Sequence, residues 1–529
     1  MKKATVQKDS YFDSVFLMSL SKKLKEVGKV EDAVVAMGTP LNLELLLSEG
    51  YPEAELAGAG PNDLVMAVDC ADEAAVGTAF EAAKGLLARK GSRLAAGARE
   101  PASLASALEE LPGANIAVIS LPGAYAAREA RKALASGLHV MLFSDNVSLE
   151  DEIALKEFGR SKGLLVMGPD CGTAIINGMP LCFANVVRPG PVGVVAASGT
   201  GLQEVTCLID RFGSGISQAI GTGGRDLKNA RVGGITMLMG IEALAKDQDT
   251  KVIVVISKPP ASEAAAKVVS ALGAAGKPAV VHFIGLDPKQ GAASASIRFA
   301  ASLEGTASLA VELAGSGPVA PGLEQTAGEA VIEAIAEREA RRLAKSQVYL
   351  RGYFTGGTVA DEALLLLHRR TGRVFSNNQA DPAFLLKDPR KSVEHTIVDL
   401  GDDAFTVGKP HPMIDPSGRN ERILAEAGDS SIAVVLIDVV LGYGSHPDPA
   451  GALVPALREA KRAAEARGGY LPVVATVIGT PGDFQGFASQ VAALEAAGCV
   501  VMPSNYRAAT LAARIVEKAA GARPKGGAR

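Results

Sequence analysis

The sequence contains no tryptophan, and aromatic residues make up only 4% of it. It also lacks an excess of positive charge, because 54 lysines and arginines stand against 58 aspartates and glutamates. Proteins that bind nucleic acid or anionic membranes usually need a basic surface, and single-strand binders need aromatic side chains for base stacking. We therefore expect neither nucleic acid nor a membrane as a partner.

Cysteine is scarce as well, and no two cysteines form a CxxC pair. The chain has five of them, Cys70, Cys171, Cys182, Cys207 and Cys499. An odd, scattered set is typical of a reduced protein rather than of a disulfide framework. The N-terminus MKKATVQKDSYF lacks the apolar core of a signal peptide, and apolar runs such as IAVVLIDVVLGY are too short to span a bilayer. These features predict a cytoplasmic protein.

Apolar residues, in contrast, are abundant and regularly placed. The 529 residues are 48% hydrophobic and 21% charged, which is enough apolar material for several cores. Short Val/Ile-rich runs alternate with longer amphipathic stretches, as βα units around a parallel sheet do. The sequence predicts an α/β protein with several doubly wound parallel-sheet domains. We place a small α/β domain at 1–90, three further domains at 91–190, 191–318 and 346–525, and a connecting segment at 319–345.

Glycine-rich segments follow three of the predicted strands, where ligands of parallel sheets bind. They are Ser198-Gly199-Thr200-Gly201, Gly221-Thr222-Gly223-Gly224-Arg225-Asp226 and Gly442-Tyr443-Gly444-Ser445-His446, and each is expected to lead into a helix. A helix N-terminus exposes unpaired N–H groups, and glycine lets an anion approach them. Two such termini aimed at one point would hold a phosphoryl group. Alternatively, the glycines only let the chain turn, because none of the segments is a P-loop or a GxGxxG motif.

Two stretches carry a family resemblance. GLLVMGPDCGTAIING and RPGPVGVVAASGTGLQEVTCLIDRFGSGISQAIGTGGRDL, within 163–227, resemble the succinyl-CoA synthetase α subunit, where GPNCPG, a VSxSGTL turn and GIGGDP occur in that order. The stretch from VDLGDD (398–403) to GYGSHPDP resembles the ligase domain of that enzyme's β subunit. The arrangement of an α-like and a β-like part in one chain, without an ATP-grasp domain, resembles that of the FdrA family.

The resemblance implies a Rossmann-like, CoA-binding-type domain followed by two flavodoxin-like ligase-type domains. It also implies an acyl-CoA synthetase or the large subunit of an oxamate carbamoyltransferase. The segment GLDPKQGAASASIRFA (285–300), which matches the phosphohistidine segment of the synthetase, contains no histidine, and Lys258 stands about where the family has the acid that holds that histidine. A lysine cannot orient an imidazole for phosphorylation. The glycine-rich CoA loop and the ATP-grasp lysines are missing as well.

The first hypothesis is therefore carbamoyl transfer, oxamate + carbamoyl phosphate ⇌ oxalurate + phosphate, in allantoin catabolism. The first and third glycine-rich segments would hold the phosphate, with Gly223 and Gly224, while Lys258 and Arg225 neutralise charge and His446 donates a proton. The alternatives are acid–CoA ligation with a separate nucleotide-binding subunit, and a non-catalytic scaffold or metabolite sensor. We expect no cofactor and no dedicated metal site. The expected partners are a small-molecule substrate and either accessory subunits or further copies of the chain.

Several other polar residues have two interpretations each. His411, Cys171 and the pair Asp402-Asp403 either belong to the site or serve packing and turns, and the same holds for Asp399. The polar stretch SNNQADP (376–382) is either a turn or an amide clamp for a planar substrate. Asp170 is expected to form a turn, and His282, inside an apolar run, to be a core residue.

Overall fold

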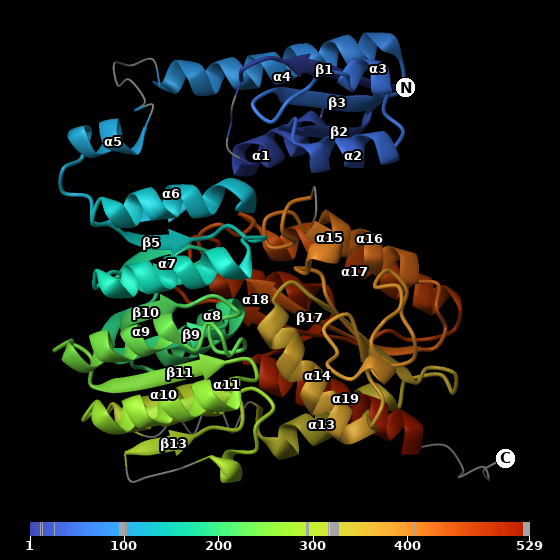
Figure 1. The fold of residues 1–529 in the computed structure, drawn as a ribbon. Helices are drawn as coiled ribbons and strands as arrows, with labels where there is room; N and C mark the ends of the chain where they lie inside the picture. The colour runs from blue at the N-terminus through green and yellow to red at the C-terminus, as the bar shows by residue number, and fades with distance from the viewer. Residues whose placement is uncertain are drawn as a thin grey trace. The chain divides into compact units, whose positions relative to one another are not determined.

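The computed structural model describes residues 1–10, 12, 14–25, 27–94, 101, 103–291, 296–315, 317, 327–406 and 409–521 (Figure 1). The chain forms two compact units. Unit 1 comprises Met1–Gly113 with Phe405–Pro410, and unit 2 comprises Ala114–Ala404 with His411–Arg529. Among the described residues, none of the helices is long and apolar enough to cross a membrane.

Unit 1 is built on a three-stranded sheet in the order β1-β3-β2. The strands β1 (Lys2–Gln7), β2 (Val30–Met37) and β3 (Leu64–Cys70) lie where the apolar runs predict them, but both pairs are antiparallel, which corrects the expected parallel arrangement. Alternate residues of β3 face opposite sides of the sheet. Leu64, Met66 and Val68 share a core with α1 (Ser14–Lys25) and α4 (Glu73–Leu94), whereas Val65 and Ala67 share one with α2 (Pro40–Ser48) and α3 (Glu53–Leu56). A further helix, α5 (Leu104–Glu110), follows.

Unit 2 begins with a small parallel sheet and continues into a seven-stranded one. The small sheet has the order β4-β5-β6, with β4 (Ile116–Ile119), β5 (His139–Leu142) and β6 (Val166–Met167), and its connecting helices are α6 (Gly123–Ala135) and α7 (Leu149–Ser161). The larger sheet has the order β13-β12-β11-β9-β10-β7-β8. Its parallel strands are β9 (Pro189–Ala197), β10 (Ile216–Gly221), β11 (Val252–Ser257), β12 (Ala279–Phe283) and β13 (Ile297–Phe299), and the hairpin β7 (Thr173–Ile176) and β8 (Met179–Cys182) completes one edge.

Helices cover both faces of the seven-stranded sheet, as a doubly wound fold requires. Val192, Val194 and Ala196 of β9 share a core with α8 (Gly199–Arg211) and α11 (Leu303–Leu313). Val195 and Ala197, which point to the other face, share one with α9 (Ile235–Lys246) and α10 (Ser262–Ala274). The short 3-10 helix η1 (Pro288–Gln290) lies between β12 and β13 in sequence.

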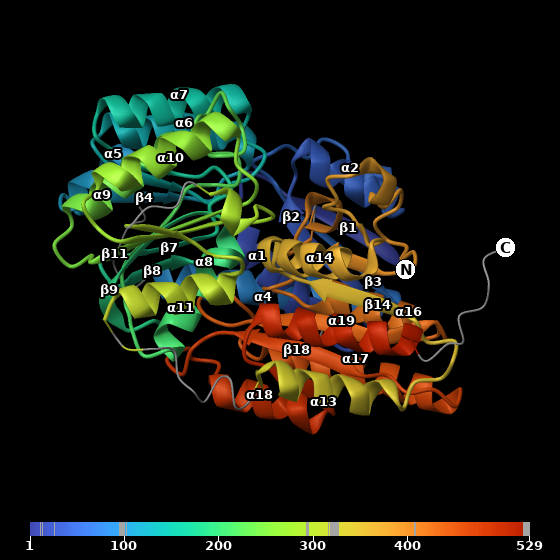
Figure 2. The same cartoon turned by 90° about the horizontal axis from the view of Figure 1, so that it is seen from below.

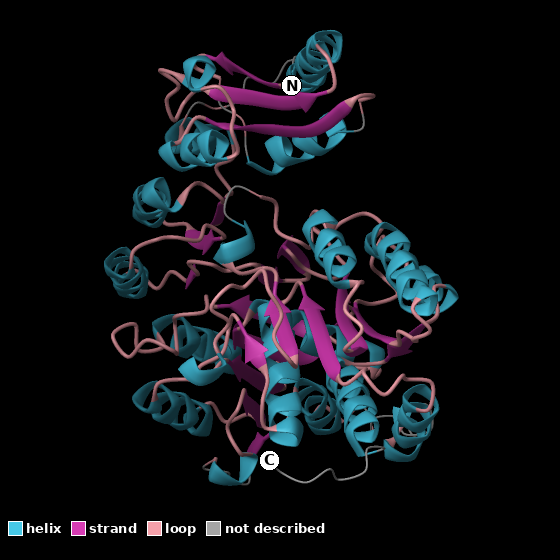
Figure 3. Ribbon diagram, turned by 90° about the vertical axis from the view of Figure 1, so that its right-hand side faces the viewer, coloured by secondary structure: helices cyan, strands magenta, loops and turns pink. Residues whose placement is uncertain are grey.

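The last sheet of unit 2 has six parallel strands in the order β15-β16-β14-β17-β18-β19. They are β14 (Tyr349–Phe354), β15 (Phe375–Ser376), β16 (Thr396–Asp399), β17 (Ile432–Val440), β18 (Val473–Ile478) and β19 (Cys499–Met502). The helices are α13 (Glu329–Ala340), α14 (Gly357–Thr371), α15 (Asp403–Thr406), α16 (Ser417–Glu426), α17 (Pro449–Ala466), α18 (Phe487–Ala496) and α19 (Asn505–Gly521), with a 3-10 turn η2 (Pro382–Phe384). Strands and helices of unit 2 alternate as layers (Figure 3).

One hydrophobic core joins the two larger sheets of unit 2. It contains Val194 and Leu202 from the β9–α8 part together with Val359 of α14 and Val434 of β17. Figure 2 shows α8 and α14 beside each other. This shared core fixes the position of α8 relative to α14, and the candidate site depends on it.

Two sequence expectations need comment here. The segment Gly221–Asp226 does not lead directly into a helix, because a series of turns follows it and α9 begins only at Ile235. Gly233 and Gly234 in these turns have positive φ angles, which a continuing helix does not tolerate. Part of the predicted connecting segment, 319–326, lies outside the described residues, and α13 occupies most of the rest.

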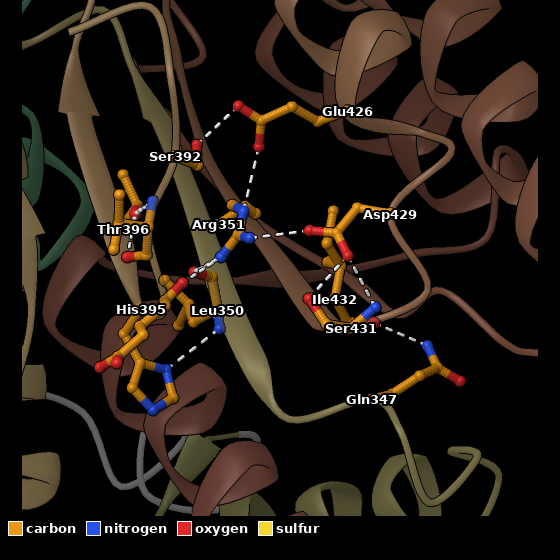
Figure 4. A network of polar contacts seen from close by, with 12 residues as sticks. Gln347, Leu350, Arg351, Ser392, His395, Thr396, Glu426, Asp429, Ser431 and Ile432 are labelled. Carbon is orange, nitrogen blue, oxygen red and sulfur yellow. Dashed lines mark hydrogen bonds and ion pairs between the residues drawn. The ribbon is translucent and has the colours of Figure 1, made fainter. Parts of the chain in front are cut away.

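A buried arginine connects β14 to its surroundings (Figure 4). Arg351, whose side chain is 4% exposed, donates from Nε to Glu426 Oε2 at 3.0 Å and from Nη2 to Asp429 Oδ2 at 2.8 Å. It also donates to the carbonyl oxygen of Glu394. Tyr353 of the same strand donates its hydroxyl to Glu426. The network therefore joins β14 to both the end of α16 and the loop before β16.

We predict that Arg351→Met lowers the free energy of unfolding of unit 2 by about 3 kcal/mol, since it removes the buried cation that Glu426 and Asp429 share and leaves the Glu394 carbonyl without this donor. Glu426 keeps a second cation, Arg422, at 2.6 Å. The control is Arg373→Met, because Arg373 is 61% exposed and pairs with Glu394 at 3.2 Å on the surface. That change should cost no more than about 0.5 kcal/mol. Urea unfolding followed by circular dichroism measures both, and equal shifts of the two midpoints would contradict the role of the network.

Candidate functional site

The turn at Ser198 is the first component of the site. Strand β9 ends at Ala197 and α8 begins at Gly199, as the sequence predicts, and the Ser198 side chain does not cap its own helix. Its Oγ donates instead to Thr358 Oγ1 at 2.8 Å. The backbone N–H groups of the first turn of α8, at Gly199, Thr200 and Gly201, have no intrahelical acceptor. They remain as donors at the positive end of a thirteen-residue helix.

The second component is a turn that sequence reasoning missed, Gly356–Thr358 between β14 and α14. The backbone N–H of Thr358 donates to Thr200 Oγ1 at 3.2 Å, so the first turns of α8 and α14 are in direct contact. A Cβ on Gly356 would lie 2.6 Å from Thr200 Cγ2, and one on Gly201 would lie 2.8 Å from Thr358 Cγ2. Glycine is therefore required at both positions. The signal was present in the sequence, since FTGGT follows an apolar strand as SGTG does.

Buried Asp438 fixes this second turn. Its side chain is fully buried, and it accepts hydrogen bonds from the backbone N–H of Thr355 at 2.8 Å and of Gly356 at 2.9 Å. It also accepts from the Thr355 hydroxyl at 3.0 Å, and Arg419 lies 3.2 Å away as its counter-ion. Burial raises the pKa of Asp438, while Arg419 opposes that shift. The carboxylate thus holds the chain between β14 and α14 in place.

Lys258, predicted to neutralise charge, lies beside the start of α14. It follows β11 and forms an ion pair with Asp361 of α14 at 2.9 Å. A Cβ on Gly357 would lie 3.5 Å from Lys258 Nζ and 2.5 Å from Asp399 Oδ2, so both charged groups flank the start of α14. Burial lowers the pKa of Lys258, but the carboxylates of Asp361, Asp399 and Asp170 outweigh it, and the pKa is raised. The lysine therefore stays charged.

Asp399, at the end of β16, is a buried carboxyl group beside this cation. Burial raises its pKa to about 6, although Lys258 opposes the shift. Asn378 Nδ2 donates to Asp399 Oδ2 at 2.9 Å, and Asn377 bonds the Asp399 backbone through both Nδ2 and Oδ1. Two amides of the SNNQADP stretch are thus committed to holding Asp399. Asp402, in turn, accepts from the Ala404 N–H at the start of α15.

His411 lies close to the same loop. A Cβ on Gly401 would be 2.7 Å from His411 Nε2, and the backbone N–H of Gly401 donates to Asp399 Oδ1 at 2.9 Å. Burial lowers the pKa of His411 to about 4, so its ring is neutral at pH 7. Because Nδ1 accepts from the Met413 N–H at 3.2 Å, the proton is on Nε2. His411 is thus positioned as a neutral donor.

Gly223 and Gly224 lie against the turn at Asp170. A Cβ on Gly223 would overlap the Pro169 carbonyl oxygen, and one on Gly224 would lie 3.8 Å from Asp170 Oδ2. The surrounding protein and the Asp145 carboxylate raise the pKa of Asp170 to about 6, whereas Lys258 and Arg225 lower it. Asp170 is nevertheless exposed to solvent.

Arg225 and Cys171, two of the residues considered in the sequence analysis, lie near this turn and interact with the protein itself. Arg225 Nε pairs with Glu152 at 2.8 Å, and Nη2 donates to the Val147 carbonyl, so the side chain holds α7. Burial raises the pKa of Cys171 to about 12, which keeps it a thiol and unsuited to nucleophilic attack at neutral pH.

Lys156 forms a buried charged network next to this turn. Its side chain is fully buried and bonds Glu152, Asp226 and the Thr222 carbonyl.

The structure places Gly442–Ser445 differently from the prediction that it opposes Ser198. The N–H of Gly442 donates to Gln485 Oε1 at 3.1 Å, and that of Tyr443 donates to the Ala184 carbonyl at 2.8 Å. The Ser445 N–H points back to the Gly442 carbonyl, and Gly444 lies against Phe183. Helix α17 begins only at Pro449. The N–H groups of Gly442, Tyr443 and Ser445 are therefore used within the protein, and Gly356–Thr358 occupies the position opposite Ser198.

His446, predicted to act as an acid, belongs to the same segment. Its backbone N–H donates to the Met413 carbonyl at 2.7 Å, and its Nδ1 accepts from the Asp448 N–H at 3.0 Å. The ring thus stabilises the turn that precedes α17. Asp399 and Asp170, unlike His446, lie near enough to Lys258 to raise its pKa.

Family models match three parts of the chain. A CoA-ligase model matches residues 353–515, a CoA binding domain model matches 187–285, and a model described as "AllF, heavy metal-associated domain" matches 1–103. The first two cover the turns at Gly356 and Ser198. They agree with the resemblance to succinyl-CoA synthetase, and the chain is a succinate–CoA ligase-like protein.

The residues of unit 1 do not fit a heavy-metal site. In the described part of the chain, no three His, Cys, Asp or Glu side chains gather in a way that could hold a metal ion. The one cysteine within 1–103 is Cys70, which is buried and has its pKa raised by burial. A thiolate ligand needs the opposite shift. The match thus concerns the fold of this unit.

Similar proteins include one over almost the whole chain and several over part of it. The protein YahF of Escherichia coli K12, titled uncharacterized, is 44% identical over 524 residues, 98% of this chain and 99% of that one. The succinate–CoA ligase α subunit 2 of Archaeoglobus fulgidus is 26% identical over 149 residues, and that of Aquifex aeolicus 28% over 155. These alignments span about half of each ligase subunit.

Among solved structures, an acetyl-coenzyme A synthetase of Candidatus Korarchaeum cryptofilum with phosphate and ADP is 17% identical, over 77% of this chain and 83% of that one. Its TM-score is 0.28, too low to support any argument, and the α/β fold rests on the strand orders given above. The family rests on the relationship with YahF and on the matched models. The chain belongs to the FdrA family of succinyl-CoA synthetase-like proteins.

Proposed function

We propose that the site formed by the first turns of α8 and α14 and by Lys258 binds an acyl phosphate and transfers its acyl group. The observation that carries this proposal is the direct contact of two uncapped helix N-termini beside Lys258. The N–H groups at Gly199, Thr200 and Gly201 and the ammonium of Lys258 are donors suited to a phosphoryl group. Neither helix closes its own N-terminus with a side chain.

The groups around these two turns suit acyl transfer without a covalent intermediate. The fixed donors would stabilise the negative charge that gathers on phosphate as it leaves. Asp399 and Asp170 both have pKa values near 6, so each can exchange a proton close to neutral pH. Neutral His411 is a further donor beside Gly401. These roles agree with the absence of a histidine from segment 285–300.

We propose CoA as the acyl acceptor, which makes the protein part of an acid–CoA ligase. The family models for a CoA-ligase and a CoA binding domain support this acceptor, as do relatives named succinate–CoA ligases. The phosphorylation step that precedes acyl transfer in such enzymes would fall to a separate nucleotide-binding subunit. That subunit, or another copy of the chain, is the partner that this function requires.

Carbamoyl transfer between carbamoyl phosphate and oxamate is the second candidate. The Lys258–Asp361 pair favours it, because a lysine in this place serves an acyl phosphate but not a phosphohistidine. Carbamoyl phosphate is itself an acyl phosphate, and the same donors would hold it. In this function no nucleotide and no CoA are needed.

The experiment that separates these candidates supplies the acyl phosphate directly, so that no nucleotide-binding partner is required. The full chain is incubated with succinyl or acetyl phosphate and CoA, and separately with carbamoyl phosphate and oxamate. Thioester, measured by mass spectrometry, is the result expected for the first candidate, and oxalurate with released phosphate for the second. Hydrolysis no faster than in buffer in both reactions would refute acyl transfer and leave the scaffold or sensor that the sequence also allows.

We predict that Lys258→Gln weakens sulfate, used as a phosphate probe of constant charge, at least about tenfold in calorimetric titrations. The reason is the loss of one charge-assisted hydrogen bond, on the order of 1.5–3 kcal/mol. The matched control is Lys251→Gln, because Lys251 precedes the other end of the same strand, where its ammonium donates to the Gln248 carbonyl at 2.7 Å. Unchanged sulfate affinity in Lys258→Gln would remove the lysine from the site.

The raised pKa values of Asp399 and Asp170 predict the direction of a pH effect. Both carboxyl groups are largely protonated at pH 5 and largely ionised at pH 7. The proposed site therefore becomes more negative as the pH rises through about 6. Sulfate affinity should therefore fall over this interval, by about tenfold in total. Asp399→Asn should flatten the profile, whereas a profile independent of pH in the unmodified protein would contradict the assigned pKa values.

A further inference from the structure

Two buried glutamates lie on the helices whose first turns form the proposed site. Glu204 is on the second turn of α8 and is 1% exposed, and Glu362 is on the second turn of α14 and is 7% exposed. The residue before Glu362, Asp361, is the one that pairs with Lys258. Along each helix, the glutamate is therefore only one turn away from the end that contributes to the site.

Both carboxyl groups bind the same residue, Asn505, which is the first residue of α19. The Asn505 backbone N–H donates to Glu204 Oε1 at 2.9 Å. Its side-chain Nδ2 donates to Glu362 Oε2 at 2.8 Å and to the Val359 carbonyl oxygen at 3.0 Å. The other oxygen of Glu362 accepts from the N–H of Leu303, at the start of α11, at 2.8 Å. One asparagine thus joins α8 to α14.

Around this cluster, negative charge is not matched by cations. Within the described part of the chain, neither of the two carboxyl groups forms an ion pair. The charged groups that face them are Glu304 of α11, Arg507 of α19, which pairs with Glu304 at 2.8 Å, and Arg211 at the end of α8. In addition, no described residue donates to the buried Oε2 of Glu204 or to the buried Oδ1 of Asn505. A fully ionised cluster would leave two buried carboxylates on one neutral asparagine.

Protonation removes this excess of charge. Burial raises the pKa of Glu204 to about 8, although the Asn505 N–H and Arg211 oppose the shift. Burial likewise raises the pKa of Glu362 to about 7, against its two hydrogen bonds. Because both groups bind one asparagine, their titrations are linked, and these values belong to the pair. At pH 7 the pair therefore keeps a proton, which it loses as the pH rises through about 8.

We propose that Glu204 and Glu362 are positioning residues that share a buried proton, and that this proton keeps α8 and α14 aligned at the site. With the proton bound, Asn505 holds both side chains without repulsion between two carboxylates. When the proton passes from a carboxyl oxygen to solvent water, the two negative charges repel each other and loosen the joint between the helices. The effect on anion binding rests on the proposed function of the two turns, whereas the proton itself does not.

Infrared spectroscopy detects this proton directly, because a protonated carboxyl group has a carbonyl band that a carboxylate lacks. Difference spectra of the unmodified full chain against Glu204→Gln, and against Glu362→Gln, should contain this band at about pH 6.5 and lose it by about pH 9.5. The matched control is Glu312→Gln, since Glu312 is 54% exposed on α11 and pairs with Arg298 on the surface. Its difference spectrum should lack the band at both pH values.

Urea unfolding and sulfate titration between pH 7 and 9.5 measure the alignment of the helices, above the range in which Asp399 and Asp170 titrate. The folded pKa values of the pair lie above that of an unfolded glutamate, so the folded state holds more protons and the urea midpoint should fall as pH rises. Sulfate affinity should fall about threefold. Glu204→Gln keeps an oxygen for the Asn505 N–H but cannot ionise, and it should reduce both changes. Glu312→Gln should alter neither.

The outcomes separate this inference from the proposed function. A band that is missing at pH 6.5, or that both glutamine variants retain in full, overturns the shared proton, and equal pH profiles of Glu204→Gln and the unmodified chain overturn its role in alignment. Sulfate binding that depends on Lys258 but does not change above pH 7 would refute the inference alone. A titrating band without sulfate binding at any pH would refute the anion site alone. If Glu204→Gln does not fold, Glu362→Gln and the titration of the unmodified chain decide.

Discussion

The site depends on the contact between the first turns of α8 and α14. Both helix ends carry partial positive charge, so bringing them together is unfavourable unless something compensates. The Ser198–Thr358 and Thr358–Thr200 hydrogen bonds hold them at contact distance, and glycines at 201 and 356 make that distance possible. Asp438 beneath one turn and Asp361 and Asp399 beside it supply negative charge. The remaining N–H groups, at the start of α8, have no intrahelical acceptor.

Two buried charged networks keep the surrounding loops in place. Asp438 with Arg419 fixes the start of α14, and Lys156 with Glu152 and Asp226 fixes the loop that carries Gly223 and Gly224. Such pairs contribute little net stability, because each charge loses its hydration on burial. They exclude alternative positions, however, since any movement of a loop would leave a buried charge unpaired. These two buried networks therefore hold the turns around the proposed site in fixed positions.

The sequence predicts the strands and the turn at Ser198 because both depend on local pattern, whereas Lys258 stands out only through the family resemblance. It does not predict which glycine-rich turn lies opposite Ser198, since Gly356 and Gly442 follow similar apolar strands. The difference is that Gln485, 43 residues further along, occupies the N–H of Gly442, while Thr200 accepts from Thr358. Likewise, apolar periodicity cannot distinguish the antiparallel sheet of unit 1 from a parallel one, because helices cover both of its faces. Both features depend on tertiary contacts that the local sequence does not show.

The ion pair of Lys258 with Asp361 affects how strongly the proposed site would bind phosphate. Any anion at the two turns competes with Asp361 for the ammonium, so a ground-state phosphate gains less than a free lysine would give it. The charge that develops on a leaving phosphate is larger, and it can attract Lys258 more strongly at that moment. Interactions that strengthen only in the transition state are those that raise a rate. The acidic groups around Lys258 thus restrain tight binding of phosphate and favour its release, which suits a site for transfer more than one for storage.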